Sequence, residues 1–327
     1  MRRKLTMRDI SQLKDQISAL YEKYKDNHDG AVATYIPELG KADPADFAIS
    51  LATVQGEVFS VGDAQREFTI QSICKPMAFI MALEKHGREK TLRHVGVEPS
   101  GDPFNSIELD PKNGPPRPFN PMVNAGAISV ASLIKGYRGL GVAEYVERLG
   151  RAAGRELRVD EAVRDSEAAT GHRNRAIAWL MRNFDIIDAD VDETLHQYFS
   201  QCSVLVNCAD LAVIGATLAN MGENPITGED VFGIQYVKDA LAVMFTCGMY
   251  DFAGEWAYRV GLPAKSGVSG GIMAVVNRQM SIAVYSPRLD ARGNSVRGIQ
   301  VCTELAEEFG LHAFDFMNVG SNFIGAL

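Results

Sequence analysis

Two side chains of this 327-residue sequence, Ser72 and Lys75, have the types and the spacing that nucleophilic catalysis needs. A serine hydroxyl is a weak nucleophile unless a base removes its proton, and a neutral lysine can be that base. Side chains three residues apart on a helix project from the same face. The pair therefore predicts an activated serine, provided that apolar surroundings lower the pKa of Lys75 toward neutrality.

The residues around Ser72 indicate a strand that leads into a helix. Phe68–Ile70 is a short β-like run, and the apolar pattern that follows it has a helical period and ends near Gly87. Pro76 has no N–H and cannot bond back to the Ser72 carbonyl, so regular helix is weakest at this point. At such a junction, free backbone N–H groups and the positive end of the helix dipole could hold an oxyanion.

The spacing alone is not specific, because composition produces a Ser-x-x-Lys pair about once in roughly 300 residues. Two further pairs occur here, Ser11 with Lys14 and Ser132 with Lys135. The first lies in a charged N-terminal segment, and the second lies inside a helical pattern where a serine hydroxyl bonds its own backbone. Only Ser72 combines the spacing with a strand-to-helix junction.

The composition is that of an ordinary soluble globular protein, with 46% hydrophobic and 23% charged residues. The formal net charge of -8 disfavours nucleic acid and anionic membranes as partners. No apolar run reaches the roughly 18 residues of a membrane span, and no apolar signal-peptide core follows the basic segment Met1–Leu5. These features predict a cytoplasmic protein that binds neither nucleic acid nor membrane.

The cysteines and histidines give no sign of a metal site. The five cysteines are odd in number, widely spaced and without a C-x-x-C pair, so neither a disulfide framework nor a zinc site is expected. The six histidines show no metal-ligand spacing either. We therefore expect chemistry that depends on side chains alone.

The elements that must position Ser72 are strands at both ends of the chain and helices between them. Helical patterns dominate from residue 121 to about 248. Hairpins imply antiparallel pairing, so we predict an α+β fold with one antiparallel sheet built from the N- and C-terminal segments, flanked by helices, beside a mostly helical lobe. Strands are expected at 47–53, 58–61, 272–277 and 280–286, and flanking helices at 7–25 and 296–309.

This arrangement predicts a single domain, 1–327, with two lobes and a cleft between them. The α/β lobe would contain 26–75 and 250–327, and the helical lobe 76–249, with 1–25 as an N-terminal helix. In the cleft, a glycine-rich segment that begins Lys265-Ser266-Gly267 would lie on an edge strand and face Ser72.

One long segment, 88–120, is rich in proline and glycine and predicts an ordered loop, which is usually functional. Asn120 before Pro121 predicts the cap of a helix that starts there. Asn124 stands in a run of small and apolar residues. A buried amide must find partners, so it either braces the backbone or binds a ligand.

Four other polar side chains have ordinary interpretations when the residues are considered alone. Tyr35 is favoured as a packing residue, although it could line a cleft. Glu167 belongs to what is typically a solvated acidic face, and Asn174 to a surface segment. Tyr198 is compatible with a core position.

Together, four ordered segments resemble the serine-dependent glutaminase family. The combination of S-x-x-K at a helix start with a late K-S-G on a strand is similar, more widely, to the β-lactamase and DD-peptidase fold. The resemblance runs from about Tyr35 to the closing helix and leaves 1–25 outside it. The segments are QSICKP (71–76), NPMVNAGAI (120–128), CGMYD (247–251) and KSGVSGG (265–271).

The resemblance implies a catalytic role for four residues. Ser72 would be the nucleophile and Lys75 its base. Tyr250 would be a second proton carrier, and the backbone N–H groups of Ser72 and Val268 would form the oxyanion hole.

The resemblance also implies the residues that bind the substrate, L-glutamine. Its α-carboxylate would be bound by Asn124, Asn174 and Tyr198, and its α-ammonium by Glu167. The complete set in chain order is Tyr35, Gln71, Ser72, Asn124, Glu167, Asn174, Tyr198, Tyr250 and Val268.

The implied reaction is hydrolysis of L-glutamine to L-glutamate and ammonia through a glutamyl-serine ester, without a metal or organic cofactor. Family precedent implies a homodimer or homotetramer. Two alternatives share the same residues: a β-lactam-type serine hydrolase, which would be exported to reach its substrate, and a non-catalytic amino-acid sensor, which could dispense with Ser72 and Lys75.

Overall fold

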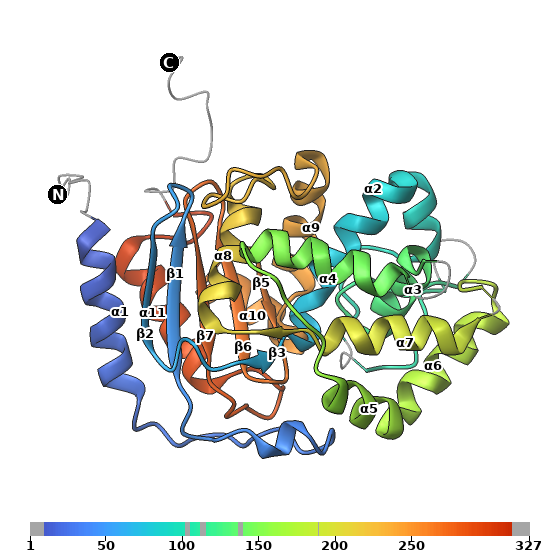
Figure 1. Ribbon diagram of the computed structural model, residues 1–327, viewed down its shortest axis with the longest axis horizontal. Helices are drawn as coiled ribbons and strands as arrows, with labels where there is room; N and C mark the ends of the chain where they lie inside the picture. Colours follow the sequence, from blue (N-terminus) through green and yellow to red (C-terminus); the bar gives the residue numbers. More distant parts are fainter. Residues whose placement is uncertain (1–9, 102–104, 112–115, 137–139, 189, 316–327) are drawn as a thin grey trace, which may run out of the picture.

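A five-stranded antiparallel sheet forms the centre of one half of the structure (Figure 1). The computed structural model describes residues 10–101, 105–111, 116–136, 140–188 and 190–315. In the sheet, β1 pairs with β7, and Ala48 lies opposite Tyr285. A strand from the N-terminal part of the chain is thus bonded to a strand from the C-terminal part. The predicted antiparallel sheet of an α+β fold is thus confirmed. Its order is β2 (Val58–Gly62), β1 (Ala48–Thr53), β7 (Met280–Tyr285), β6 (Gly271–Val276) and β5 (Ala264–Ser266).

Helices cover both faces of this sheet, which explains why β1, β6 and β7 are buried along their whole length. On one face, Ile49 and Ile282 pack with α1, α10 and α11. On the other face, Ala283 packs with α8. These helices are α1 (Ile10–Tyr24), α8 (Cys208–Ala219), α10 (Ala253–Arg259) and α11 (Val296–Phe309).

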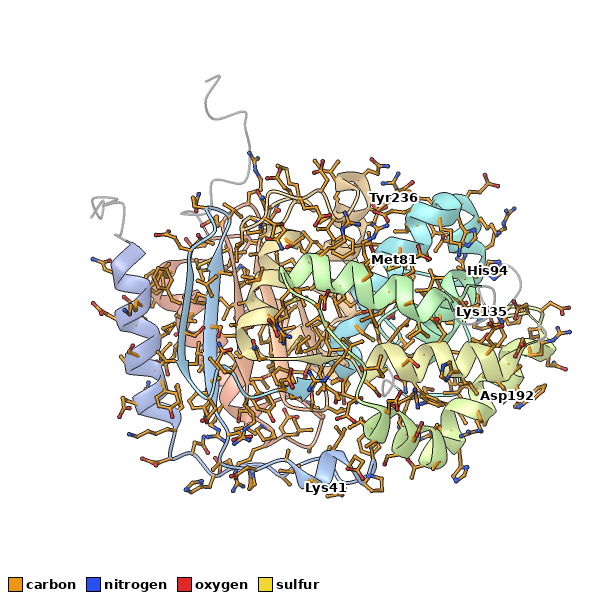
Figure 2. All side chains as sticks on the ribbon, viewed as in Figure 1. Lys41, Met81, His94, Lys135, Asp192 and Tyr236 are labelled. Carbon is orange, nitrogen blue, oxygen red and sulfur yellow. The ribbon has the colours of Figure 1, made fainter. Side chains whose placement is uncertain are left out.

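The other half of the structure is helical and lies on the side of the sheet opposite α1 (Figure 1). Lys135 and Asp192 mark its outer end, far from the sheet (Figure 2). Its helices are α2 (Lys75–His94), α3 (Asn124–Ile134), α4 (Leu140–Ala153), α5 (Glu161–Thr170), α6 (His172–Asn183), α7 (Val191–Cys202) and α9 (Ile234–Cys247).

A short second sheet connects the halves immediately before Ser72. It pairs β3 (Phe68–Thr69) with β4 (Leu205–Val206), with Phe68 opposite Val206. The Ile70 N–H also donates to the Val204 carbonyl at 2.8 Å. The segment that leads into Ser72 is thereby attached to the chain between α7 and α8.

Two predicted boundaries were wrong, and one helix was missed. Gly87, with φ of 73°, kinks α2, but helical structure resumes after it and continues to His94, so the predicted loop from residue 88 starts later. The helix predicted from Pro121 begins at Asn124, because the Asn120 side chain accepts from the N–H groups of Met122 and Val123 in a turn of its own. Helix α10 was missed, since its seven residues are too few to show a period.

Parts of two predicted elements lie outside the described residues: 7–9 of the N-terminal helix, and 102–104 with 112–115 of the long loop. All five cysteines are described, and each carries a buried free thiol. Within the described residues, no helix is long and apolar enough to span a membrane.

Candidate active site

Ser72 lies in a 3₁₀ turn, Gln71–Cys74, that leads directly into α2. The Lys75 N–H donates to the Ser72 carbonyl, three residues back, where the missing N–H of Pro76 prevents an ordinary helical bond. Gln71 has φ of 50°, an uncommon left-handed conformation for a residue with a Cβ atom. The chain therefore turns sharply at the serine, as the sequence predicts for this junction.

Lys75 is buried, with 1% of its surface exposed. Its Nζ donates to the Met122 carbonyl at 3.1 Å and to Asn124 Oδ1 at 2.8 Å. Both acceptors are neutral, so neither compensates fully for the loss of hydration of an ammonium group. Burial accordingly lowers the pKa of Lys75 to about 8, which leaves a substantial fraction of the amine neutral near neutral pH.

Tyr250 approaches Ser72 from the chain that follows α9. Burial raises the pKa of Tyr250, and a hydrogen bond with the Ser72 side chain opposes that rise. Its hydroxyl also donates to the Ser266 carbonyl at 3.0 Å. Tyr250 has φ of 57°, so it too adopts the left-handed conformation. A phenol that stays protonated next to Ser72 is suited to donating a proton.

The glycine of the CGMYD segment explains how Tyr250 reaches this position. A Cβ atom on Gly248 would lie 1.7 Å from the Ala264 carbonyl oxygen. Helix α9 can therefore end against strand β5 only with glycine there, and the Ser266 N–H donates to the Gly248 carbonyl at 3.2 Å across the same contact. The segment thus fixes Tyr250 beside the strand that carries Lys265 and Ser266.

The KSGVSGG segment brings Val268 to the same site. Gly267 donates to the Gly271 carbonyl at 2.9 Å and closes a tight turn between β5 and β6. Gly270 has φ of 104°, and a Cβ atom on it would lie 2.3 Å from the Ser286 carbonyl oxygen. Within the described residues, the Val268 N–H has no backbone carbonyl partner. An unpaired N–H on this turn is available to an oxyanion.

Eight of the residues expected to bind substrate line one cavity, whose volume is about 110 Å³. Lys75 and Tyr250 stand behind its wall rather than in it. The cavity is far smaller than typical drug-sized pockets, and its size suits a ligand as small as an amino acid. The eight are Tyr35, Gln71, Ser72, Asn124, Glu167, Asn174, Tyr198 and Val268.

Glu167 is buried in the cavity wall and is not part of a solvated face. It is 7% exposed, and within the described residues its Oε2 atom has no hydrogen-bond partner. Burial raises the pKa of Glu167 well above its usual value, and Lys75 acts in the opposite direction. An unpartnered buried carboxylate is costly, so it marks a place where a cationic group of a ligand can bind. The acidic-face interpretation holds for its exposed neighbours Glu161 and Asp165.

Asn124 connects Lys75 to the rest of the cavity. Its Oδ1 accepts from Lys75, and its Nδ2 donates to Asn174 Oδ1 at 3.0 Å. Asn174 is the third residue of α6, which a break at Gly171 separates from α5, the helix of Glu167. The sequence predicts that Asn124 either braces the backbone or binds a ligand. In the structure its amide braces two side chains instead of the backbone, and it also lines the cavity.

The two tyrosines of the cavity differ in exposure. Tyr198 is 2% exposed, as a core position predicts, yet it also faces the cavity from α7. Tyr35 is 57% exposed and borders the cavity, so the favoured interpretation as a packing residue was wrong.

Four polar residues of the cavity wall were not among the expected site residues: Asn105, Thr170, Arg173 and Cys202. Cys202 stands one helical turn after Tyr198, so the i,i+4 spacing could have identified it. Its Sγ lies 3.9 Å from that of Cys74, in the turn of Ser72. Arg173 directly precedes Asn174 and was interpreted as a surface residue; it is exposed at the rim of the cavity.

A second, larger cavity of about 320 Å³ borders Tyr250 and Met122 but includes neither Ser72 nor Glu167. The chemistry is therefore expected in the smaller cavity. A serine at a sharp turn and the Val268 N–H line that cavity, and a low-pKa amine and a protonated phenol stand behind its wall. These are the kinds of groups that acyl transfer requires. The buried carboxyl group of Glu167 is of a kind that could pair with a cationic group of a ligand.

Comparison with known proteins gives one consistent family. The glutaminase family model matches residues 30–314. A glutaminase of Nostoc sp. is 57% identical over 309 residues, which cover 93% of this chain and 91% of that protein. The solved structure of the probable glutaminase ybaS aligns with a TM-score of 0.89 and 37% identity, covering 94% of this chain and 99% of that one. The L-glutamate binding form of Mglu aligns with a TM-score of 0.89 and 40% identity, covering 96% and 70%.

Proposed function

Because the chain belongs to the glutaminase family and hydrolyses L-glutamine to L-glutamate and ammonia, we propose that it does so through a glutamyl ester on Ser72. The observation that carries this proposal is one cavity whose wall contains both a serine in a sharp turn and an unpartnered buried carboxylate. A buried lysine with a pKa of about 8 stands behind that wall. Mglu, a relative of known structure, has an L-glutamate binding form, which agrees with a product complex in this fold.

In the first half of the reaction, neutral Lys75 takes the proton of the Ser72 hydroxyl while Oγ attacks the side-chain amide carbon of glutamine. The C=O bond becomes a single bond to an oxyanion, which the N–H groups of Ser72 and Val268 stabilise. When the carbonyl re-forms, the C–N bond breaks, and the leaving nitrogen receives a proton from the Tyr250 hydroxyl and departs as ammonia. The proton held by Lys75 then restores the phenol.

In the second half, a water molecule attacks the ester carbon, and Lys75 takes one of its protons. The oxyanion forms again in the same position, which is why one pair of N–H groups serves both steps. The bond between the carbonyl carbon and Ser72 Oγ then breaks, and Oγ receives the proton from Lys75. L-glutamate leaves, and the enzyme has returned to its starting state.

Selectivity for the α-ammonium group would come from Glu167. The carboxylate is buried without a partner, so a bound ammonium would pair it and remove part of the cost of its burial. The α-carboxylate would bind to Asn124, Asn174 and Tyr198, which line the same cavity. A substrate that lacks the ammonium leaves Glu167 unpaired and is disfavoured.

We expect kcat to rise with pH through a limb near pH 8. The proposed base acts only when neutral, and the pKa of Lys75 is lowered to about 8, so the neutral fraction grows as pH increases through this value. Two pH units below the pKa, kcat should be about 1% of its plateau. Initial rates of ammonia release from saturating L-glutamine between pH 6 and 9 would measure the limb.

Glu167→Gln serves as the control, because it removes a carboxyl group of the cavity whose pKa burial raises. The variant should keep the limb in kcat while losing any pH dependence that ionisation of Glu167 gives to KM. A kcat that is independent of pH across this range would exclude Lys75 as the base.

The covalent intermediate can be tested directly. Wild-type enzyme mixed with L-glutamine and acid-quenched within one turnover should carry a glutamyl adduct on the peptide that contains Ser72, detectable by mass spectrometry. The adduct should be absent when L-glutamate at low concentration replaces glutamine. Ammonia release without a burst and without any adduct on this peptide would instead indicate direct attack by water.

Several finer features belong to the same proposal. We infer a β-lactamase/DD-peptidase-like fold, because Ser72 precedes a helix while Lys265 and Ser266 occupy an edge strand. Three features remain predictions: the lobe boundaries (26–75 with 250–327, and 76–249), the homodimer or homotetramer, and the cytoplasmic location. Sedimentation of the purified protein would test the assembly.

A further inference from the structure

A second lysine, Lys265, is fully buried close to the first one. It lies on β5, the edge strand of the main sheet, with 0% of its surface exposed. Its Nζ donates to the Ser266 carbonyl at 2.7 Å and lies 4.2 Å from the centroid of the Tyr250 ring. Burial lowers the pKa of Lys265, and the charge of Lys75 lowers it further.

Burying an amine is costly unless the site uses it. None of the groups that influence the pKa of Lys265 is a carboxylate, so an ion pair does not account for its burial. Lys265 is also absent from the wall of the Ser72 cavity, so direct contact with a substrate does not account for it either. The contacts that remain are the face of the Tyr250 ring and one carbonyl.

That carbonyl is shared. The Ser266 oxygen accepts from both Lys265 Nζ and the Tyr250 hydroxyl, at 2.7 and 3.0 Å. Tyr250 is therefore held at two points by adjacent residues of one strand: its ring faces the amine, and its hydroxyl bonds to the carbonyl that the amine also binds.

The backbone at Tyr250 has an uncommon conformation. It has φ of 57°, in a short 3₁₀ turn rather than in a regular helix. Tyr250 also borders the second cavity of about 320 Å³. The orientation of its ring therefore depends on the groups that contact it, and the amine of Lys265 is one of them.

We propose that Lys265 is a positioning residue, which holds the Tyr250 ring and aims its hydroxyl at Ser72 without touching the substrate. The inference rests on the proposed role of Tyr250 as a proton carrier. It predicts that the amine influences proton transfer and leaves the affinity for glutamine nearly unchanged, because the cavity wall does not contain it.

The test is a double-mutant cycle between Lys265→Met and Tyr250→Phe, with kcat and KM for L-glutamine as the readouts. Lys265→Met alone should lower kcat about 10- to 100-fold and change KM less than about threefold, because only the transition state uses the aimed hydroxyl. In the Tyr250→Phe background, where no hydroxyl is left to aim, the same change should lower kcat by less than about threefold. Equal losses in both backgrounds would overturn the proposal.

Lys265→Arg separates positioning from simple filling of space. Methionine matches the buried volume of lysine better than arginine does, whereas arginine keeps N–H groups that can face the ring and donate to the carbonyl. Positioning predicts a higher kcat for the arginine variant, and a purely structural role predicts a higher kcat for the methionine variant. The order can be measured even if one variant is poorly stable, by normalising rates to the folded fraction.

Lys135→Met is the matched control. Lys135 also donates three hydrogen bonds, to Asp188, Asp190 and Thr194, but it lies at the outer end of the helical half (Figure 2). The kcat of the Lys135→Met variant should equal that of the wild type. If Tyr250→Phe itself keeps full kcat, the positioning role falls together with the role of the phenol, while the Ser72 adduct remains a separate test of the ester mechanism.

Discussion

Replacing Ser72 with alanine is expected to lower kcat for L-glutamine by about 10⁴-fold or more. The methyl group cannot form the ester, and the low-pKa Lys75 behind the cavity wall then has no hydroxyl to deprotonate. The loss should appear in kcat, because the cavity walls that bind the amino-acid part of glutamine are unchanged. Ammonia release by purified wild type and variant, side by side, would measure it.

Ser132→Ala is the matched control, since Ser132 also stands three residues before a lysine, within α3. Its activity should be that of the wild type. Isothermal titration with L-glutamate would show that the Ser72 variant still has an intact cavity, with a Kd within a few fold of the wild type. Retained turnover in Ser72→Ala would remove the serine from the reaction.

Replacing Glu167 with glutamine is expected to reduce kcat/KM for L-glutamine by about 10²- to 10³-fold. The variant loses a buried pair between carboxylate and ammonium, which is worth about 3–4 kcal/mol when one partner is removed. Most of the change should be in KM, because the α-ammonium does not take part in bond breaking. The α-ammonium group lies at the end of glutamine that is far from the side-chain amide.

A second substrate makes this test specific. 4-Carbamoylbutanoate is glutamine without the α-amino group, and the wild type should disfavour it strongly. In Glu167→Gln the preference for glutamine over this analogue should fall to less than about tenfold, because the buried charge that rejects the analogue is gone. Glu161→Gln, on the exposed first turn of the same helix, should keep the wild-type preference. An unchanged preference in Glu167→Gln would assign ammonium binding to another group.

Much of the fold could be predicted because its signals are local. The alternation of apolar residues identified the hairpin of β6 and β7, and the helical period identified α11 within its boundaries. The wrong boundaries came from side-chain turns and short elements. Asn120 bonds two N–H groups outside the helix it was expected to cap, and such a choice depends on what packs around it.

The candidate site was predictable only in part from the residues alone. Ser72 and Lys75 are neighbours in sequence, so their spacing reports their geometry. Glu167 was assigned to a surface because its helix carries other charges. Its burial depends on α7, a later helix that packs against α5. The apolar pattern around Lys265 does not predict its burial next to Tyr250. That burial depends on the close approach of α9 to β5, which Gly248 permits.

Helix α1 shows that the limits of a family and the limits of a folding unit differ. The family match begins at residue 30, yet Ile17 and Leu20 of α1 are almost completely buried in the core beneath the sheet. Tyr21 stacks on Phe47 with 5.1 Å between ring centroids. Substitutions on the inward face of this helix should therefore destabilise the fold, and substitutions on its outward face should be tolerated. A chain that began at residue 30 would expose an apolar sheet face to other molecules, so α1 protects the sheet from self-association.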